Sequence, residues 1–403
     1  CLRFIMKFRS FFFLLFFVSL TAQSPYNAIG HGIILDSPDA ASLAFSSTGL
    51  IPSFNSRFSS SNPTTWTDLV FTYLTGHYNA EEVNTGSFRS GLGTLSTAAF
   101  IVPINGKYAF GMGMTPISRK SFDLMGDTTS VVFSGDTLTL SKTMDGSGGI
   151  STMFAGGAWN VSPKHTVGIR FDFLFGVYDE HTVSHIDYRS SEYARRFAYK
   201  GTFLSGYYRF VPTPEKRRLS AFAGFQLPFG SQYIARTDFF TYVESDLQPR
   251  MDFVLPTTLS GGLIYSISSS IHAGAELVIR SFFGSSEADN LNTLDGEMGR
   301  ANRISIGLTR EKIFGSRDIM NMFHYRVGFF RRSHYIRELG NDLTEMGLSF
   351  GIGVPFGLTQ NQLDFGFRIS RRSGFLSDSP ETINQFSVGL TLGDLWLVKG
   401  KRR

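Results

Sequence analysis

The feature that most constrains this sequence is an alternation of apolar and small side chains with a period of two residues. In the stretch INQFSVGLTLGDLWL, which runs from Ile383 to Leu397, Phe386, Val388 and Leu390 share one parity, and glycine, serine and threonine occupy most of the other. Successive side chains of a strand point to opposite faces, so this stretch predicts a strand with one apolar face and one small-residue face. The pattern recurs, with some charged residues on the small face, at 165–177, 271–280 and 363–370.

Two environments could hold such strands. In a soluble sandwich, a second sheet would have to cover every apolar face, and glycine, serine and threonine would face water. In a barrel that spans a membrane, the apolar face contacts lipid, the other face encloses the interior, and closure leaves no backbone edge unpaired in hydrocarbon. The barrel explains both faces at once. The predicted fold class is therefore all-β, a transmembrane antiparallel β-barrel.

The strand count and the connections favour the same fold. About 14 segments are strand-like, an even number, as single-chain bacterial barrels require. Such barrels have short periplasmic turns and long outer loops, and most of the connections alternate in this way. The exception is 311–321, where a small helix could lie. With an even number of strands, we expect both termini of the chain on the periplasmic side.

The candidate strands are 66–77, 89–102, 107–118, 149–160, 165–177, 201–211, 219–229, 257–267, 271–280, 303–310, 322–332, 345–354, 363–370 and 383–397. The short connections are 103–106, 161–164, 212–217 and 268–270, and the long polar ones are 119–148, 178–200, 230–256 and 283–302.

The N-terminus has the features of a targeting segment. From Met6, a basic start is followed by an apolar run from Phe11 to Val18 and then by small residues, which is the anatomy of a secretory signal peptide. After residue 22 no apolar run approaches the roughly 20 residues of a membrane helix. We therefore expect a protein of the outer membrane of a Gram-negative-type bacterium. The predicted parts are a signal peptide with upstream residues (1–22), an N-terminal hatch (23–62), an outer-membrane β-barrel (63–398) and a basic periplasmic tail (399–403).

Charge and composition narrow the class of partner. The sequence holds 38 Lys and Arg against 33 Asp and Glu, and charged residues are 18% of the chain, below the roughly 25% of soluble domains. A nucleic-acid-binding protein needs a concentrated basic face, whereas the dense basic runs here are Lys399 to Arg403 and short pairs such as Arg371-Arg372. No nucleic-acid partner is predicted.

Residues 25–62 do not alternate. Asp36 or Ser37 is the candidate cap of a short helix that has Pro38 at its first position, continues from Asp39 to Phe45 and ends at Gly49. The surrounding residues are apolar, which favours a plug inside the barrel over a flexible periplasmic tail.

No motif predicts an enzyme, a cofactor or a metal site. The sequence lacks a phosphate-binding loop and an H-E-x-x-H pair, and its single cysteine is Cys1. His77, His181, His185 and Ser190 are candidates for catalysis near the outer rim, but their spacing pairs no nucleophile with a base. His324 falls on the polar parity of its strand, where it would serve as a hydrogen-bonding group of the lumen or contact a ligand.

Residues on the inward parity are the main clue to function. Opposite charges two or four residues apart could form ladders of ion pairs that hold a plug, and an excess of arginine could bind a carboxylate through two parallel hydrogen bonds. Inward apolar residues fit either a conduit for hydrophobic molecules or the surface on which the plug packs. The charged set is Arg170, Asp172, Glu276, Arg280, Arg326, Arg332, Asp364 and Arg368, and the apolar set is Leu174, Phe222, Ile264, Val278 and Phe330.

The arrangement resembles the outer-membrane long-chain fatty acid and hydrocarbon transporter family, the FadL-like barrels. These have a signal peptide, an N-terminal hatch with a gly-gly, asp, ala-ala, asn-pro-ala-gly-leu type sequence, and a 14-stranded barrel. The matching residues fall in the same order, although Ser46, Ser47 and Thr48 replace the asn-pro-ala part. They are Gly30, Gly32, Asp36, Ala40, Ala41, Gly49 and Leu50.

The resemblance implies passive transport of hydrophobic small molecules, with long-chain fatty acids as the leading cargo. We expect capture in the 119–148 loop, followed by movement of the segment from Ile33 to Leu50. The expected ligand-binding residues are Ile33, Leu35, Phe45, Leu50, Phe122, Leu124, Phe133, Phe222, Phe330, Arg326 and Arg368. The other expected partners are outer-membrane lipids and, during biogenesis, the barrel assembly machinery. The alternative is a structural or secretion-associated barrel that docks periplasmic or secreted proteins; an enzyme of the outer leaflet ranks third.

Overall fold

The computed structural model describes residues 24–394, except 55–57, 86–88, 127, 134–135, 188, 241–242, 245–250, 254, 283–296, 314, 316–317, 339–340, 358–360 and 375–379. The predicted signal peptide and the basic tail lie outside the described residues, as do Leu395 to Leu397 of the last predicted strand. No described helix is long and apolar enough to cross a membrane.

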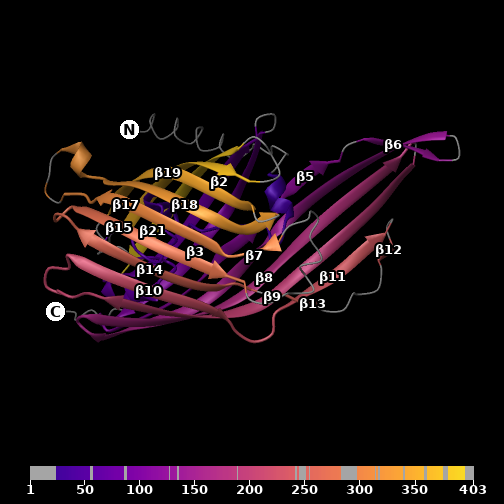
Figure 1. Ribbon diagram of the computed structural model, residues 1–403. Helices are drawn as coiled ribbons and strands as arrows, with labels where there is room; N and C mark the ends of the chain where they lie inside the picture. The colour runs from indigo at the N-terminus through magenta and orange to yellow at the C-terminus, as the bar shows by residue number, and fades with distance from the viewer. Residues whose placement is uncertain are drawn as a thin grey trace, which may run out of the picture.

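Fourteen strands among the described residues close into an antiparallel barrel (Figure 1). Each pairs with the next along the chain, and the last pairs with the first, with Asp394 opposite Thr72. The strands are β2 (Thr72–Asn84), β3 (Arg89–Ile104), β4 (Tyr108–Arg119), β7 (Asp136–Ser162), β8 (His165–Ile186), β9 (Arg189–Phe210), β10 (Leu219–Pro228), β14 (Thr257–Ser266), β15 (Ile271–Ser281), β17 (Ala301–Arg310), β18 (His324–Glu338), β19 (Asn341–Phe356), β20 (Asn361–Ser373) and β21 (Glu381–Asp394).

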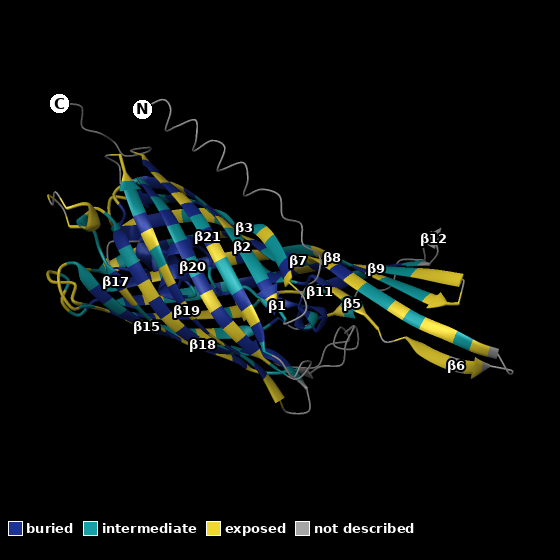
Figure 2. Ribbon diagram, turned by 90° about the horizontal axis from the view of Figure 1, so that it is seen from above, coloured by how far each residue is buried: buried dark blue, intermediate teal, exposed yellow. Residues whose placement is uncertain are grey.

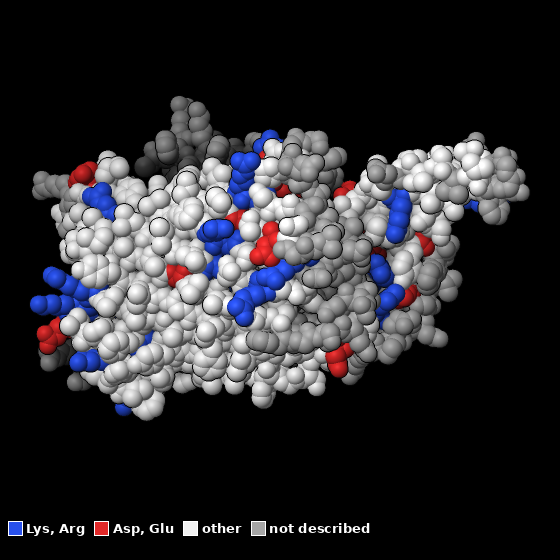
Figure 3. Space-filling view, in the orientation of Figure 1, with Lys and Arg blue, Asp and Glu red and all other residues white. Residues whose placement is uncertain are grey.

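The predicted fold class and strand count are confirmed, and the alternating parities hold. Inward residues such as Leu174 and Ile264 are fully buried, whereas outward residues such as Met112 and Leu259 are 61% exposed. Figure 2 shows the resulting checkerboard of buried and exposed residues around the wall, and Figure 3 shows a barrel surface that is largely uncharged between its ends. An exposed apolar belt of this kind is the lipid-facing surface of a membrane barrel.

The start of the first strand differs from the prediction for a local reason. The first strand begins at Thr72 and not at residue 66, because Pro63–Asp68 form a 3₁₀ helix, η2, whose first turn is capped by the side chain of Asn62. The short helix η4 (Ile319–Asn321) occupies the connection in which a small helix was expected. The start of β2, the last described residue of β21 and the short turns all lie at the same end of the barrel. In barrels of this type this is the periplasmic end.

The long connections were predicted as polar loops, and this was wrong for much of their length. Strands β7, β8 and β9 have 27, 22 and 22 residues, about twice what a membrane crossing needs. Their outer halves form an arm that projects beyond the barrel (Figure 1). The arm is widened by β5 (Phe122–Met125), β6 (Thr129–Phe133) and β11 (Tyr233–Phe240). The remaining short strands are β12 (Val243–Glu244), β13 (Met251–Asp252) and β16 (Glu297–Met298).

Residues 24–71, called the hatch below, run through the lumen from the outer end to the periplasmic end. They contain η1 (Pro25–Ala28), the two-residue strand β1 (Ile33–Ile34), the helix α2 (Ala40–Phe45) and η2. Helix α2 was expected, but its cap is Asp39, whose carboxylate accepts a hydrogen bond from the amide of Ser42 at 2.7 Å. It ends at Ser46, which has a left-handed φ of 58°, and not at Gly49.

Candidate functional site

The inner wall of the barrel is shaped to the hatch. Phe45 at the end of α2 lies against three glycines on neighbouring strands. A Cβ added at Gly274 or Gly307 would lie 2.8 or 2.5 Å from the Phe45 ring, and one added at Gly328 would lie 2.6 Å from the Phe45 carbonyl oxygen. Such close approach of a side chain and a backbone requires residues without a Cβ. The small-residue face of the strands therefore contacts the hatch and does not line an open pore.

A buried glutamate of the wall binds the turn that follows α2. The carboxylate of Glu276 on β15 accepts hydrogen bonds from the Ser47 hydroxyl at 2.8 Å and from the amides of Thr48 and Ile51 at 2.7 and 3.1 Å. The Thr48 hydroxyl donates a further bond to it. Hydrogen bonds to a charged acceptor are about twice as strong as neutral ones, so Glu276 anchors this turn.

Asp36 of the hatch is surrounded by arginines from three strands. Its carboxylate lies 2.7 Å from Arg280, 3.0 Å from Arg303 and 2.8 Å from Arg332. Burial by itself would raise the pKa of Asp36, but the three guanidinium groups hold this pKa well below its usual range. The hatch therefore carries a permanent negative charge that fixes it to β15, β17 and β18.

The arginine cluster continues to a second carboxylate. Glu345 on β19 accepts hydrogen bonds from Arg332 at 2.6 Å and from Arg372 at 3.2 Å, and His334 lies 3.1 Å away. Arg332 bridges Asp36 and Glu345, so the ion pairs of the wall and of the hatch form one network.

Arg326 and Arg368, which were expected to bind ligand, also contact the hatch. Arg326 donates to Asp364 at 2.8 Å and to the Ser53 hydroxyl at 3.1 Å. Arg368 donates to the Ser37 hydroxyl at 2.5 Å, and its guanidinium lies 4.7 Å from the centre of the Phe330 ring. In this structure both arginines hold the hatch against the wall.

A cavity of about 170 Å³ lies in the lumen on the outer side of α2. One part of its lining is apolar and consists of Ile150, Leu174, Phe203 and Leu255, and another part is polar and consists of Arg280, Asp36, Arg119, Glu81 and Gln385. The hatch supplies the floor with residues such as Ile34 and Leu35. The cavity therefore presents an apolar wall beside an arginine.

The same cavity reaches a break in the barrel wall. Strands β3 and β4 pair only from Ala98 opposite Met114 to their periplasmic ends. Beyond this point β4 pairs instead with β1 of the hatch, with Ile34 opposite Ser118, and the amide of Leu35 donates to the Ile117 carbonyl at 2.7 Å. The hatch thus occupies the place that β3 leaves in the wall.

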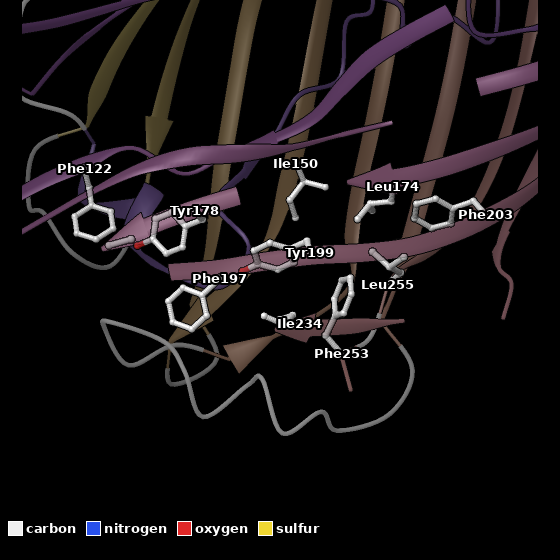
Figure 4. Close-up of a cluster of buried hydrophobic side chains, with 11 residues drawn as sticks. Phe122, Ile150, Leu174, Tyr178, Phe197, Tyr199, Phe203, Ile234, Phe253 and Leu255 are labelled. Atoms are coloured by element: carbon white, nitrogen blue, oxygen red, sulfur yellow. The ribbon is translucent and has the colours of Figure 1, made fainter. Parts of the chain in front are cut away.

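Above the cavity, the base of the arm encloses an aromatic cluster (Figure 4). Phe122, Tyr178, Phe197 and Tyr199 are buried there together with Ile234 and Phe253. Lys120, which precedes β5, lies 3.5 Å from Glu180 and 4.1 Å from the centre of the Tyr178 ring. Burial lowers the pKa of Lys120 to about 8, although Glu180 opposes the shift.

The expected ligand-binding residues fall into separate groups in the structure. Phe45, Leu50 and Phe222 pack together between hatch and wall, and Phe330 lies beneath arginines. Ile33 is buried beside Tyr335. Phe122 and Leu124 belong to the aromatic cluster, and the side chain of Phe133 lies outside the described part of the chain. Among the expected residues whose side chains are described, only Leu35 is found in the cavity lining.

Several lining residues were not singled out from the sequence as a site. Phe203 lies on a segment whose alternation is weak, and Leu255 lies in the connection 230–256 that was expected to be a polar loop, so parity assigned neither of them inward. Arg303 is fully buried in the cluster around Asp36, and its inward parity on 303–310 could have identified it.

The histidines do not form a catalytic arrangement in the structure. His77 is buried on β2 and not at the outer rim, and its ring accepts a hydrogen bond from the Ala40 amide at 3.4 Å. His181, His185 and Ser190 are exposed on the arm. His324 is stacked on Phe54 of the hatch at 5.0 Å. The described residues contain no group of three or more His, Cys, Asp or Glu side chains placed to hold a metal ion.

Comparison with solved structures confirms the resemblance at the level of the fold. The CymD monoaromatic hydrocarbon channel is 12% identical, with a TM-score of 0.57, and the match covers 88% of this chain and 97% of CymD. The Pseudomonas putida toluene transporter TodX is 11% identical, with a TM-score of 0.54, and the match covers 89% of this chain and 98% of TodX. The protein therefore has the fold of an outer-membrane β-barrel channel. No curated protein sequence matches it.

One protein family matches nearly the whole sequence. The BamG family pattern aligns with residues 3–238 and 230–402, which include the hatch, the arm and all barrel strands described above. The chain belongs to the BamG family.

Proposed function

We propose that this protein is a passive channel for small hydrophobic molecules in the bacterial outer membrane. One observation carries the proposal: the lumen cavity adjoins the stretch where β3 and β4 no longer pair, and only a two-residue strand of the hatch fills that place. A molecule in the cavity would reach the bilayer by displacing β1, without removal of α2 or of the ion pairs around Asp36.

The size and lining of the cavity suggest the class of cargo. An apolar cavity of about 150 Å³ can hold benzene, so about 170 Å³ would accept a single ring or the end of an acyl chain. The solved channels of similar fold are named for monoaromatic hydrocarbons. Long-chain fatty acids remain the finer proposal, because Arg280 at the edge of the cavity is 18% exposed and pairs with Asp36 through Nη1, which leaves its other N–H groups able to donate to a carboxylate.

A disulfide across β1 and β4 tests this route. Ile34 and Ser118 are direct cross-strand partners, so the pair I34C and S118C meets the geometric needs of a disulfide, and Cys1 is the only natural cysteine. We expect uptake of labelled toluene or oleate by cells to fall on oxidation and to recover on reduction, while the single variants I34C and S118C transport normally. Equal uptake with the disulfide fully formed would show that the route is wrong.

The second candidate is a barrel that docks other proteins. It is supported by the arm and by the many ion pairs that fix the hatch, since a docking barrel needs a rigid wall and an exposed surface and no passage. It predicts that detergent-purified protein carries a protein partner and no small hydrophobic ligand in native mass spectrometry. The channel proposal predicts the reverse.

A further inference from the structure

Strands β17 to β20 present aligned rows of outward side chains. Register places Leu308, Val327, Phe350 and Phe367 in one row, and Ile306, Phe329, Leu348 and Ile369 in the next row toward the outer end. The following rows are Ile304, Arg331, Met346 and Arg371, and then Asn302, Ser333, Thr344 and Ser373. The lipid-facing surface thus changes from apolar, through a row with two arginines, to a row of amides and hydroxyls.

The two arginines lie at the outer edge of the apolar belt. Leu348 is 58% exposed, and Met346, between the arginines, is 51% exposed, so this wall still faces lipid at the height of Arg331 and Arg371. Both arginines are exposed. One strand separates them, which places their Cβ atoms about 10 Å apart. Two long guanidinium side chains at this separation can reach a single group between them.

Neither arginine has an anionic partner within the described residues, unlike its neighbours. Arg332 and Arg372, the next residues along the chain, point inward and pair with Glu345. Arg337, nearer the outer end of β18, pairs with Asp342 at 2.8 Å. A guanidinium group at the edge of hydrocarbon is energetically costly without a counter-ion. Arg331 and Arg371 would therefore be stabilised by an anion from outside the chain.

We propose that Arg331 and Arg371 bind a phosphate group of a lipid in the outer leaflet. Phosphate groups of lipid headgroups are the anions present at this depth, and guanidinium groups bind phosphate through paired hydrogen bonds. The next row toward the outer end provides further hydrogen-bond donors, the hydroxyls of Ser333, Thr344 and Ser373. Between the two arginines, the exposed side chain of Met346 can contact an acyl chain. The lipid is a surface ligand of the wall, independent of the cargo of the lumen.

Native mass spectrometry with a defined lipid tests the proposal. The full chain, purified in a neutral detergent, is incubated with diphosphoryl lipid A, and the lipid-bound fraction is compared with that of the double variant R331S/R371S. Loss of two charge-assisted contacts should lower affinity roughly tenfold or more. The matched control is R337S on the same strand, which should bind as the natural protein does. Heat-modifiable migration in gel electrophoresis verifies that each variant is folded.

Two further samples separate lipid recognition from simple attraction of anions. Lipid A without phosphates should bind the natural protein as weakly as the double variant binds diphosphoryl lipid A. Millimolar inorganic phosphate should leave the lipid bound. Equal binding of the phosphate-free lipid, displacement by inorganic phosphate, or unchanged binding by R331S/R371S would each overturn the proposal.

Discussion

Single glycines decide whether the hatch can sit in the lumen. Where the wall faces α2 and the turn after it, several inward residues are glycines, and some of their close approaches are to backbone atoms of the hatch. The carbonyl of Phe45 over Gly328 is such a case. A clash with backbone cannot be relieved by a rotamer change, so even one methyl group matters at this position.

Gly328→Ala should therefore loosen the hatch. The added Cβ would lie 2.6 Å from the Phe45 carbonyl oxygen, and overpacking of this kind costs about 1–3 kcal/mol. The measurement is the urea midpoint of unfolding in detergent, together with protease cleavage in the hatch. Gly261→Ala is the control, because a Cβ there meets no atom within 4 Å. Equal midpoints for the two variants would contradict this account of the wall.

Asp36 is the charge on which the arginine cluster depends. Replacing it with Asn leaves the buried Arg303 and the partly buried Arg280 without their carboxylate partner, and removal of one partner of a buried pair costs about 3–5 kcal/mol. We expect faster hydrogen exchange of hatch amides in D36N at neutral pH. The control D342N breaks the half-exposed ion pair between Asp342 and Arg337. This variant should lower the free energy of unfolding by about 0–1 kcal/mol.

The depressed pKa of Asp36 also sets a pH range. A carboxyl group whose pKa is lower in the folded state stabilises that state above its unfolded value, here 3.8, and this contribution is lost as the pH falls through the folded value. The stabilisation of the hatch by Asp36 should therefore be complete at pH 5 and should decline only below about pH 3.8. Loss of exchange protection already between pH 6 and pH 5 would contradict the assignment.

At the scale of elements, the arm depends on how its base is packed. Strand β8 carries different chemistry on its two faces at this height. On the inner face, Glu180 accepts a hydrogen bond from Tyr178 at 2.5 Å and pairs with Arg195 at 2.5 Å and with buried Lys120. On the outer face, Asp179 pairs with Arg196 in solvent. Adjacent residues thus make one buried and one exposed ion pair.

Glu180→Gln and Asp179→Asn separate these two environments. E180Q leaves Lys120 and Arg195 without their carboxylate and should destabilise the arm by about 3–5 kcal/mol, whereas D179N should change it by about 0–1 kcal/mol. Protease cleavage within the arm, measured on folded protein in detergent, should increase for E180Q alone. Similar cleavage of the two variants would mean that the inner cluster does not support the arm.

At the scale of the whole molecule, the hatch turns a wide barrel into a closed one. A 14-strand wall encloses far more space than the cavity of about 170 Å³ beside the hatch. The hatch crosses the entire lumen, from η1 at the outer end to η2 at the periplasmic end. We therefore expect the hatch to block the passage of water and ions along the barrel axis, in contrast to the water-filled porins.

This closure predicts the electrical behaviour of the protein. In planar bilayers the intact protein should show no sustained ionic conductance, and a variant that lacks residues 33–54 should show large open steps, because the described hatch residues that fill the middle of the lumen are gone. G328A offers a milder comparison that keeps the whole chain and should give brief openings. Sustained conductance by the intact protein would contradict a lumen filled by the hatch.

The sequence by itself determined the barrel, its 14 strands and the inward placement of residues such as Asp172, Glu276 and Arg332, because side-chain parity is a local property of each strand. It also indicated α2, through Pro38 and the apolar residues that follow, although it placed the cap at Asp36 or Ser37 and the structure places it at Asp39. Only the tertiary structure showed which residues of the hatch and of other strands these inward charged side chains contact. The contacts of Asp36 with Arg280, Arg303 and Arg332 and the pairing of β1 with β4 join segments distant in the chain. No spacing along one sequence encodes which distant strands will face a given hatch residue, so these features emerge only when the barrel closes.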